Sequence, residues 1–196
     1  SEPEKLHQIM ATIASSTRQT SHLANQLLAS ARAAPEGLAG RPFEKIDLCE
    51  ITRAVTSTKV PAALESGIDL GYEGLTEPTY IMGDATLIEE LLKNLVHNAL
   101  IYCPEGSAVT VRLENDFKDD VVRLTVEDNG PGIPVEHHKD VFKRFYRMND
   151  AGQEEGCGLG LSIVKEIAAR HETKVKLSQP QGHGGCVVSV RFERCQ

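Results

Sequence analysis

The pattern of hydrophobic and polar residues divides the chain into a first helical segment and a longer mixed segment. Over residues 4–33, apolar and small residues recur at alternating spacings of three and four, which is typical of a helix with one narrow seam. The seam comprises Leu6, Ile9, Ile13, Ser16, Thr20, Leu23, Leu27 and Ser30. A seam of this kind needs a partner helix, so we predict that residues 1–34 belong to a helical bundle and either dimerise or fray. The alternative is a helix that packs on its own domain.

A linker is predicted after this helix. Residues 35–46 contain two prolines and two glycines, and these residue types interrupt helices and mark loops. We therefore place a domain boundary here and expect residues 47–196 to form one globular domain.

Helical and strand patterns alternate downstream of the linker. Asp47 and Asp84 can cap helices over residues 48–64 and about 85–103, and a third amphipathic helix is expected at residues 162–168. In the first of these helices, the side chains expected to face the core are those of Leu48, Ile51, Val55, Val60 and Leu64. Strands are predicted, with the first two as a hairpin, at residues 68–70, 79–82, 108–114, 121–127, 173–178 and 186–192. This order predicts an α/β fold.

The predicted helix over residues 85–103 has a polar edge beside its apolar face. The apolar face comprises Ile88, Leu91, Leu92, Leu95, Ala99 and Cys103. Asn94, Asn98 and Tyr102 follow the border of that face at spacings of four. The side expected to face solvent carries Glu89, Lys93 and His97. Helix interiors disfavour asparagine, and a half-buried amide needs partners. The two amides therefore either bond to a neighbouring loop or offer oxygens to a hard cation beside a ligand.

Two glycine-containing segments flank the predicted helices and strands. Asp128 ends a β-branched run and precedes a glycine turn at residues 129–134. Residues 156–161 form a second glycine-rich segment that opens the helix at 162–168. A loop of this kind can place backbone N–H groups and a helix N-terminus against phosphate. Each segment alone also occurs as an ordinary turn, so it is their order, together with the upstream asparagines, that indicates a site.

Aromatic and basic residues alternate between these two segments, over residues 141–147. Lys143, Arg144 and Arg147 form a basic cluster in an acidic chain. Beside a glycine-rich loop, this cluster indicates an anionic ligand. The alternative is a solvated basic face, which suits Lys143 better than the two arginines.

Composition excludes several classes of function. The net charge of −7 argues against nucleic-acid binding. No apolar run is long enough to span a bilayer, and no signal peptide is recognisable. The five cysteines are scattered without metal-ligand spacing, as expected for reduced thiols in a cytosolic protein. The seven histidines also lack ligand spacing, and we expect them at the surface or in loops.

Four segments, in this order, resemble the catalytic ATP-binding domain of bacterial sensor histidine kinases, which belongs to the GHKL or Bergerat-fold superfamily. They are similar to the family's N box, G1 box, F box and G2 box, at Asn94–Tyr102, Asp128–Ile133, Phe142–Arg147 and Gly156–Val164. The resemblance covers residues 43–192, and residues 20–32 are similar to the second helix of the family's dimerisation bundle. It implies a two-layer α/β sandwich, with a mixed sheet of about five strands under three helices, preceded by one long bundle helix.

The resemblance also implies how ATP and Mg²⁺ are bound. Asp128 would accept a hydrogen bond from the adenine amino group, and Gly130 and Gly132 would let the backbone approach the base. Asn98 would bind Mg²⁺, with Asn94 nearby in the phosphate and metal shell. Further nucleotide contacts are expected from Tyr102, Ile133, Lys143, Gly156, Gly158, Leu159, Gly160 and Leu161.

The predicted catalytic residues are Asn94, Asn98, Arg144 and Arg147. The two arginines are candidates for the terminal phosphate, and Met148–Glu155 would form a short mobile lid over ATP. Related ATPases of the superfamily carry a water-activating glutamate where Asn94 stands. An amide is a poor general base, and Glu90 lies one helical turn farther away, so we expect ATP to be held for transfer rather than hydrolysed.

Three positions depart from the family pattern. Ile101 stands where the family often has a lysine that reaches phosphate, and Cys157 stands where a small residue is usual. The family's phosphoacceptor is a histidine followed by an acidic residue on the first bundle helix, and neither His7 nor His22 matches it. We therefore expect that the chain lacks this helix and does not autophosphorylate alone.

The resemblance thus predicts a protein-histidine kinase domain. It would transfer the γ-phosphate of Mg²⁺-ATP to a histidine on the missing helix, for relay to an aspartate of a response regulator. The full-length protein is expected to be a homodimer anchored in the bacterial inner membrane, with this domain in the cytoplasm and no nucleic-acid partner. The alternative is a degenerate nucleotide-binding or interaction module without kinase activity.

Overall fold

The computed structural model describes Met10 and residues 42–116, 119–148, 158–180 and 184–195. The predicted helix over residues 4–33, apart from Met10, lies outside these ranges, as do Gly156, Cys157 and residues 149–155 of the predicted lid. The elements in chain order are β1 (Glu44–Asp47), α2 (Leu48–Glu65), β2 (Asp69–Gly74), β3 (Tyr80–Gly83), α3 (Ala85–Tyr102), β4 (Ala108–Asp116), β5 (Val121–Asp128), the short 3₁₀ helix η1 (Val135–His137), α4 (Gly160–Arg170), β6 (Val175–Ser178) and β7 (Cys186–Glu193).

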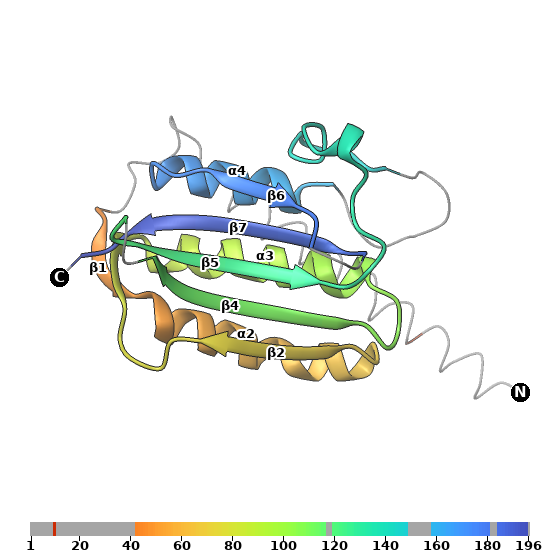
Figure 1. The fold of residues 1–196 in the computed structure, drawn as a ribbon, viewed down its shortest axis with the longest axis horizontal. Helices are drawn as coiled ribbons and strands as arrows, with labels where there is room; N and C mark the ends of the chain where they lie inside the picture. Colours follow the sequence, from red (N-terminus) through yellow and green to blue (C-terminus); the bar gives the residue numbers. More distant parts are fainter. Residues whose placement is uncertain (1–9, 11–41, 117–118, 149–157, 181–183, 196) are drawn as a thin grey trace, which may run out of the picture.

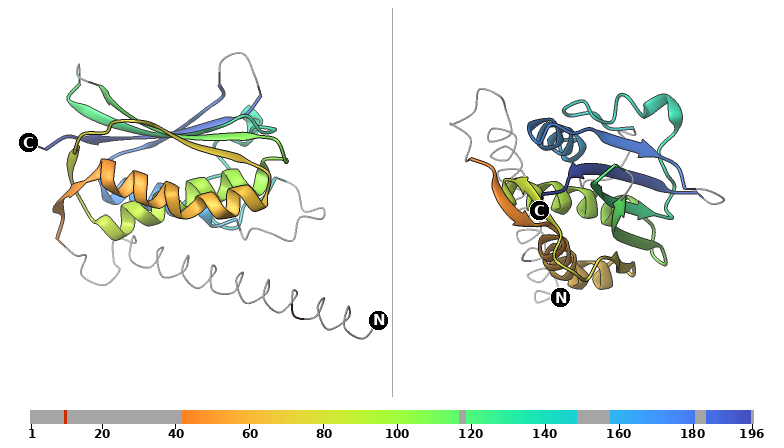
Figure 2. Two further views of the ribbon diagram at one scale, coloured as in Figure 1. Left: turned by 90° about the horizontal axis from the view of Figure 1, so that it is seen from below. Right: turned by 60° about the vertical axis from the view of Figure 1, so that its left-hand side comes forward.

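Five strands form one mixed sheet, and helices α2, α3 and α4 cover one face of it. The strand order is β2-β4-β5-β7-β6, with β2 and β4 parallel and the other pairs antiparallel. The sheet lies in front of the helices in Figure 1, and the two layers are seen from the side in Figure 2. The predicted α/β sandwich of five strands and three helices is therefore confirmed.

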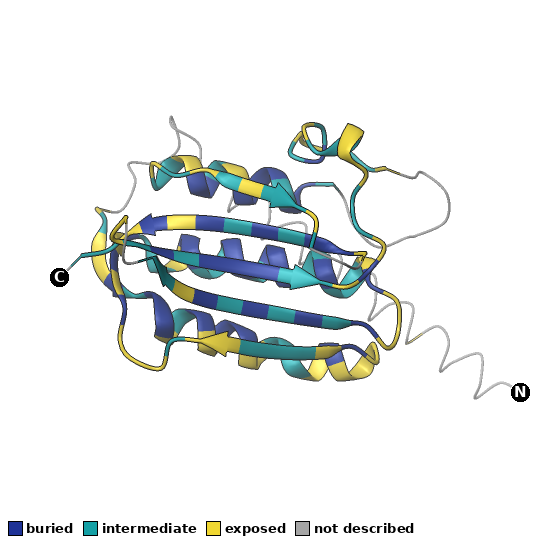
Figure 3. Ribbon diagram, viewed as in Figure 1, coloured by how far each residue is buried: buried dark blue, intermediate teal, exposed yellow. Residues whose placement is uncertain are grey.

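The hydrophobic core lies between these two layers. Alternate residues of β4, β5 and β7 are buried against the helices, and this alternation is visible along the strands in Figure 3. The apolar face predicted for α3 is entirely buried, with no side chain above 9% exposure: Ile88, Leu91, Leu92, Leu95, Ala99 and Cys103. Helix α3 contacts both α2 and α4, so it is the central helix of its layer.

Both predicted helix caps are present. The Asp47 carboxylate accepts hydrogen bonds from the Cys49 and Thr79 backbone N–H groups at 2.9 and 3.0 Å, and therefore also joins α2 to the start of β3. Asp84 accepts from Thr86 and Leu87 at 3.0 and 3.2 Å. The inward position predicted for Leu64 is wrong: its side chain is 72% exposed, because the end of α2 rotates Ala63 rather than Leu64 toward the sheet.

The pairing of the first strands also differs from the prediction. Residues 68–70 and 79–82 were predicted to form a hairpin, but β2 pairs in parallel with β4, and β3 pairs with β1 in a separate two-stranded sheet. Strand β1 was not predicted and occupies the last residues of the expected linker. Alternation of side chains determines which face of a strand is buried, but not its partner. The partner of β2 arrives only after α3 has crossed between the two parallel strands.

His171 joins several elements at the point where α4 ends. Its Nδ1–H donates to the Ile167 carbonyl oxygen at 2.8 Å, and its Nε2 accepts the Asp84 backbone N–H at 3.1 Å. The ring stacks on Phe43 with 4.6 Å between centroids and meets Phe192 edge-on. His171 lies in the turn directly after α4, in agreement with the expectation that histidines lie at the surface or in loops, but it is partly buried and connects the end of α4 to the start of α3.

No helix in the described part of the chain is both long enough and apolar enough to cross a membrane.

We predict that His171 makes the stability of the domain pH-dependent. Burial lowers the pKa of His171, and the positive charge of Arg170 acts in the same direction. The hydrogen bond to the Ile167 carbonyl and the charge of Asp84 raise this pKa and offset only part of the effect. The unfolded chain therefore binds the proton more readily, and the free energy of unfolding should fall as the pH drops below about 6.5. Replacing His171 by Gln should cost about 1–2 kcal/mol at pH 7.5, because a hydrogen bond and ring stacking are lost.

Denaturant unfolding of the wild type and His171→Gln at pH 7.5 and 5.5 tests this prediction. The wild type should lose more stability than the variant between these two pH values. An equal loss in both proteins would show that His171 does not carry the pH dependence.

Candidate functional site

A cavity of about 340 Å³ lies between α3, the ends of β5 and β7, and the segment that leads into α4. This volume is typical of a small-molecule site. Most of the predicted site residues line it. They come from α3, from the turn after β5 and from the segment before and at the start of α4: Asn98, Tyr102, Asp128, Gly132, Ile133, Arg147, Gly158, Gly160 and Leu161.

Asp128 ends β5 and faces one end of the cavity. Its Oδ1 accepts the Gly130 backbone N–H at 3.0 Å, and the Cys103 thiol and the Cys186 backbone N–H also donate to the carboxylate. Burial raises the pKa of Asp128, while these donors act in the opposite direction. The carboxylate is thus desolvated and held in one orientation, which suits it to accept a hydrogen bond from a ligand.

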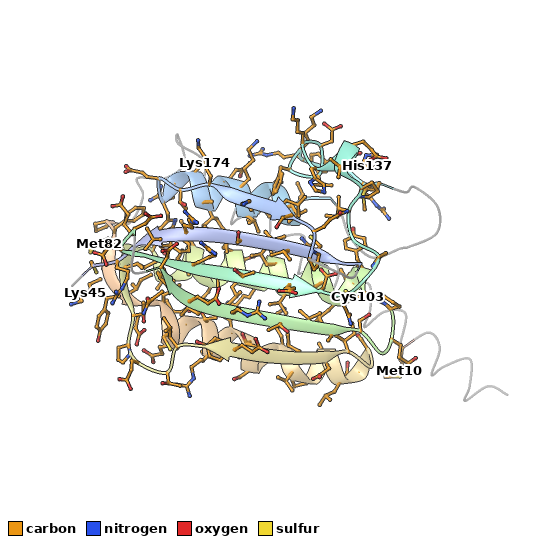
Figure 4. The ribbon with its side chains drawn as sticks, in the orientation of Figure 1. Met10, Lys45, Met82, Cys103, His137 and Lys174 are labelled. Carbon is orange, nitrogen blue, oxygen red and sulfur yellow. The ribbon has the colours of Figure 1, made fainter. Side chains whose placement is uncertain are left out.

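Two thiols stand beside this carboxylate. Burial and the nearby charge of Asp128 raise the pKa of both Cys103 and Cys186 to about 12. Both cysteines therefore stay protonated at neutral pH, and a thiol is a poor nucleophile in that form. Figure 4 labels Cys103 near the end of β5, on the side of the molecule where His137 also lies. The sequence did not indicate that either cysteine lines the cavity, because neither belongs to a motif that suggested a ligand.

The start of α4 packs against Asn98, and both line the cavity. A Cβ atom on Gly160 would lie 2.8 Å from Asn98 Oδ1, so only glycine permits this contact. Gly158 has φ = 69°, and a Cβ there would meet the backbone of Phe145 and Tyr146 at 2.7 Å. The glycine-rich segment therefore brings the first turn of α4, with its unpaired backbone N–H groups, to the edge of the cavity.

Asn94 takes a different position from Asn98. It is 1% exposed and does not line the cavity. Its Nδ2 donates to the Glu90 carbonyl oxygen at 2.8 Å and to Glu90 Oε1 at 3.2 Å. The structure thus separates the two asparagines that sequence spacing had placed on one edge, and the role predicted for Asn94 remains a proposal.

The predicted basic cluster is divided in the same way. Arg147 lines the cavity. Lys143 instead pairs with Asp140 at 2.6 Å, and this contact raises the pKa of Lys143. Arg144 pairs with Glu166 of α4 at 2.7 Å. Four further predicted site residues do not line the cavity: Gly130, Lys143, Arg144 and Leu159. Gly156 lies outside the described residues.

Sequence reasoning missed several residues of the cavity. His97 was expected to face solvent, yet it lines the cavity. Ile101, whose position the resemblance had placed within reach of phosphate, lines it as well. Tyr146 lines it too, and its hydroxyl is hydrogen-bonded to His137 Nδ1 at 2.7 Å. The spacing of four between His97 and Ile101 places both on one side of α3, but this spacing does not show that the side of the helix at His97 lines a cavity.

Comparisons with known proteins agree with this fold. Residues 83–195 match the family described as histidine kinase-, DNA gyrase B-, and HSP90-like ATPase. Among solved structures, the catalytic domain of histidine kinase ThkA is similar, with a TM-score of 0.68 and 27% sequence identity over 79% of this chain and 97% of that chain.

Curated relatives extend the similarity over the whole chain. The sensor protein kinase PmrB of Pseudomonas aeruginosa is 34% identical over 94% of this chain, and the probable sensor histidine kinase TcrY of Mycobacterium tuberculosis is 32% identical over 100% of it. The chain spans 38% and 40% of the lengths of these two relatives.

The family match covers more than half of the chain and includes every described residue of the cavity, and the fold agrees with a histidine kinase catalytic domain. The chain therefore belongs to the histidine kinase-, DNA gyrase B-, and HSP90-like ATPase family and carries the GHKL-type catalytic domain of sensor kinases.

Proposed function

We propose that this domain binds Mg²⁺-ATP and transfers its γ-phosphate to a histidine of the full-length kinase. The observation that carries the proposal is the held carboxylate of Asp128 at one end of a 340 Å³ cavity, with Asn98 and the N-terminus of α4 farther along it. This arrangement offers an acceptor for a base amino group at one end and donors for phosphate at the other.

At the base end, Asp128 recognises the adenine amino group as a hydrogen-bond donor. The backbone N–H groups of Gly130 and Cys186 orient the carboxylate, so little ordering is needed when the ligand binds. The apolar side chains of Ile133, Val126 and Val188 line the same cavity and can pack against the faces of the base. A base with a carbonyl oxygen at that position would meet the carboxylate unfavourably, which favours adenine over guanine.

The protein groups near the phosphates fit Mg²⁺ that is held mainly by the nucleotide. No group of three or more His, Cys, Asp or Glu side chains in the described residues is arranged to bind a metal. Mg²⁺ commonly uses one or two protein oxygens and completes its shell with phosphates and water. The amide oxygen of Asn98 suits this role, whereas a metal site built from the protein alone would need more ligands. When bound, Mg²⁺ would neutralise charge on the phosphates.

The chain's own residues favour transfer over hydrolysis. Phosphoryl transfer depends mainly on positioning and charge stabilisation. Arg147 lines the cavity and can stabilise charge on the terminal phosphate. Asn94 replaces a carboxylate base with an amide, and that amide is bonded to Glu90. Because Glu90 does not line the cavity, it is not positioned to activate water there.

The acceptor and partners belong to the full-length protein. We place the acceptor histidine on a bundle helix outside this chain, and the phosphoryl group then passes to an aspartate of a response regulator. The similar kinase ThkA has been solved in complex with a response regulator protein. The full-length protein would be a homodimer anchored in the bacterial inner membrane, with this domain in the cytoplasm.

Asp128→Asn should weaken ATP binding at least about tenfold, because the amide keeps only one acceptor oxygen, and the Gly130 N–H already donates to one oxygen of the carboxylate. The same change should stabilise the nucleotide-free fold. Since the folded state raises the pKa of Asp128, ionising it opposes folding, and stability falls as the pH rises through that range. A neutral amide removes this penalty, so the free energy of unfolding at pH 7.5 should be higher in the variant than in the wild type.

Calorimetric titration of ATP and denaturant unfolding measure the two effects. Glu127→Gln is the matched control, because Glu127 is the neighbouring carboxylate on β5 and pairs with Arg112 at 2.9 Å, away from the cavity. Unchanged ATP affinity in Asp128→Asn would refute the assignment of the base end.

Asn98→Ala should reduce autophosphorylation of the full-length kinase at least about 100-fold, because both the metal contact and the packing against Gly160 are lost. Transfer of ³²P from γ-labelled ATP to the acceptor histidine provides the measurement. A wild-type rate would rule out the metal role of Asn98. ATP binding without any transfer in the wild type would support a degenerate binding module instead.

A further inference from the structure

We propose that His97 binds the phosphate end of the nucleotide as a hydrogen-bond donor, an inference that rests on the ATP site proposed above. Nothing in the sequence had indicated this role, since His97 was expected on the solvent side of α3. The structure instead places it in the wall of the cavity.

The two ends of the cavity are distinguished along α3. At the C-terminal end of this helix, Cys103 donates to Asp128, and a Cβ on Gly130 would lie 2.7 Å from Cys103 Sγ and 3.1 Å from Asp128 Oδ1. Cys103 and Asp128, which both line the cavity, therefore mark the base end. His97 lies six residues earlier, which is roughly 9 Å along a helix axis. Because a ribose separates adenine from its phosphates, this displacement brings His97 to the level of the phosphates.

Other donors gather at the same level. Asn98 packs against Gly160 at the start of α4, an 11-residue helix whose N-terminal N–H groups carry partial positive charge. Among the described residues that line the cavity, the side chains with N–H donors are His97, Asn98 and Arg147. A triphosphate needs several donors, and His97 can supply one from a ring nitrogen in either tautomer.

Ile101 makes the contribution of His97 testable. It lies one turn after His97 on the same side of α3 and lines the same cavity, but it has no polar side-chain atom. A lysine at position 101 would carry an ammonium group into the space that His97 serves. An N–H donor at the phosphate end can therefore be supplied without restoring the imidazole.

The experiment measures ATP and adenosine affinity by calorimetry in the 196-residue chain, in the presence of Mg²⁺. His97→Ala should weaken ATP binding about tenfold and leave adenosine binding unchanged, because adenosine lacks the phosphates. The double variant His97→Ala/Ile101→Lys should recover most of the lost ATP affinity. Its recovery would also show that the His97→Ala chain is folded.

Lys93→Ala is the matched control. Lys93 is a cation on the same helix, but it pairs with Glu89 at 2.8 Å and does not line the cavity. Its removal should change ATP affinity by less than about twofold, since exposed charges are screened by salt.

Three results would overturn the proposal: unchanged ATP affinity in His97→Ala, an equal loss of ATP and adenosine affinity, or a failure of the Ile101 lysine to restore binding. These results leave ATP binding by the wild type intact and so leave the proposed function standing. If the wild type bound no ATP at all, the proposed function would fail, and the role of His97 would fail with it.

Discussion

The structure depends on the packing of α3 against the sheet. One face of this helix is buried in the core, and the polar edge beside that face lines the cavity. The buried face, from Ile88 to Ala99, is part of the core between the two layers. Asn98 and Tyr102 lie beside that face, so the residues that meet the ligand are positioned by the same packing that stabilises the fold. A shift of α3 would disturb the core before it could move the site, which gives the cavity a rigid wall.

The carboxylate of Asp128 shows what this arrangement costs. Burial at the end of β5 disfavours its charge, and three hydrogen-bond donors offset part of that cost. A fully solvated carboxylate would destabilise the fold less. However, it would be mobile, and water would compete with the ligand for its oxygens. The site therefore holds a group that is unfavourable for stability and favourable for binding, as is common at functional sites.

Contacts far from the cavity connect the elements that form it. Helix α4 begins at Gly160 against Asn98 and ends at Arg170. The next residue, His171, accepts the backbone N–H of Asp84 just before α3. The two helices are thus joined at both ends. Phe43, which stacks on His171, lies immediately before β1, so the segment entering the domain also contacts this junction.

The sequence by itself determined the helices, most strands, both caps and the segments that surround the site, because helix and strand periods, cap residues and glycine turns are local properties of the chain. Tertiary structure alone decided the parallel pairing of β2 with β4, the pairing of β1 with β3, and the exposure of Leu64. It also turned Asn94 toward Glu90 and placed His97, Cys103 and Cys186 in the cavity wall. These outcomes depend on which surfaces meet across the fold, and residue spacing within one helix or strand carries no information about its partner.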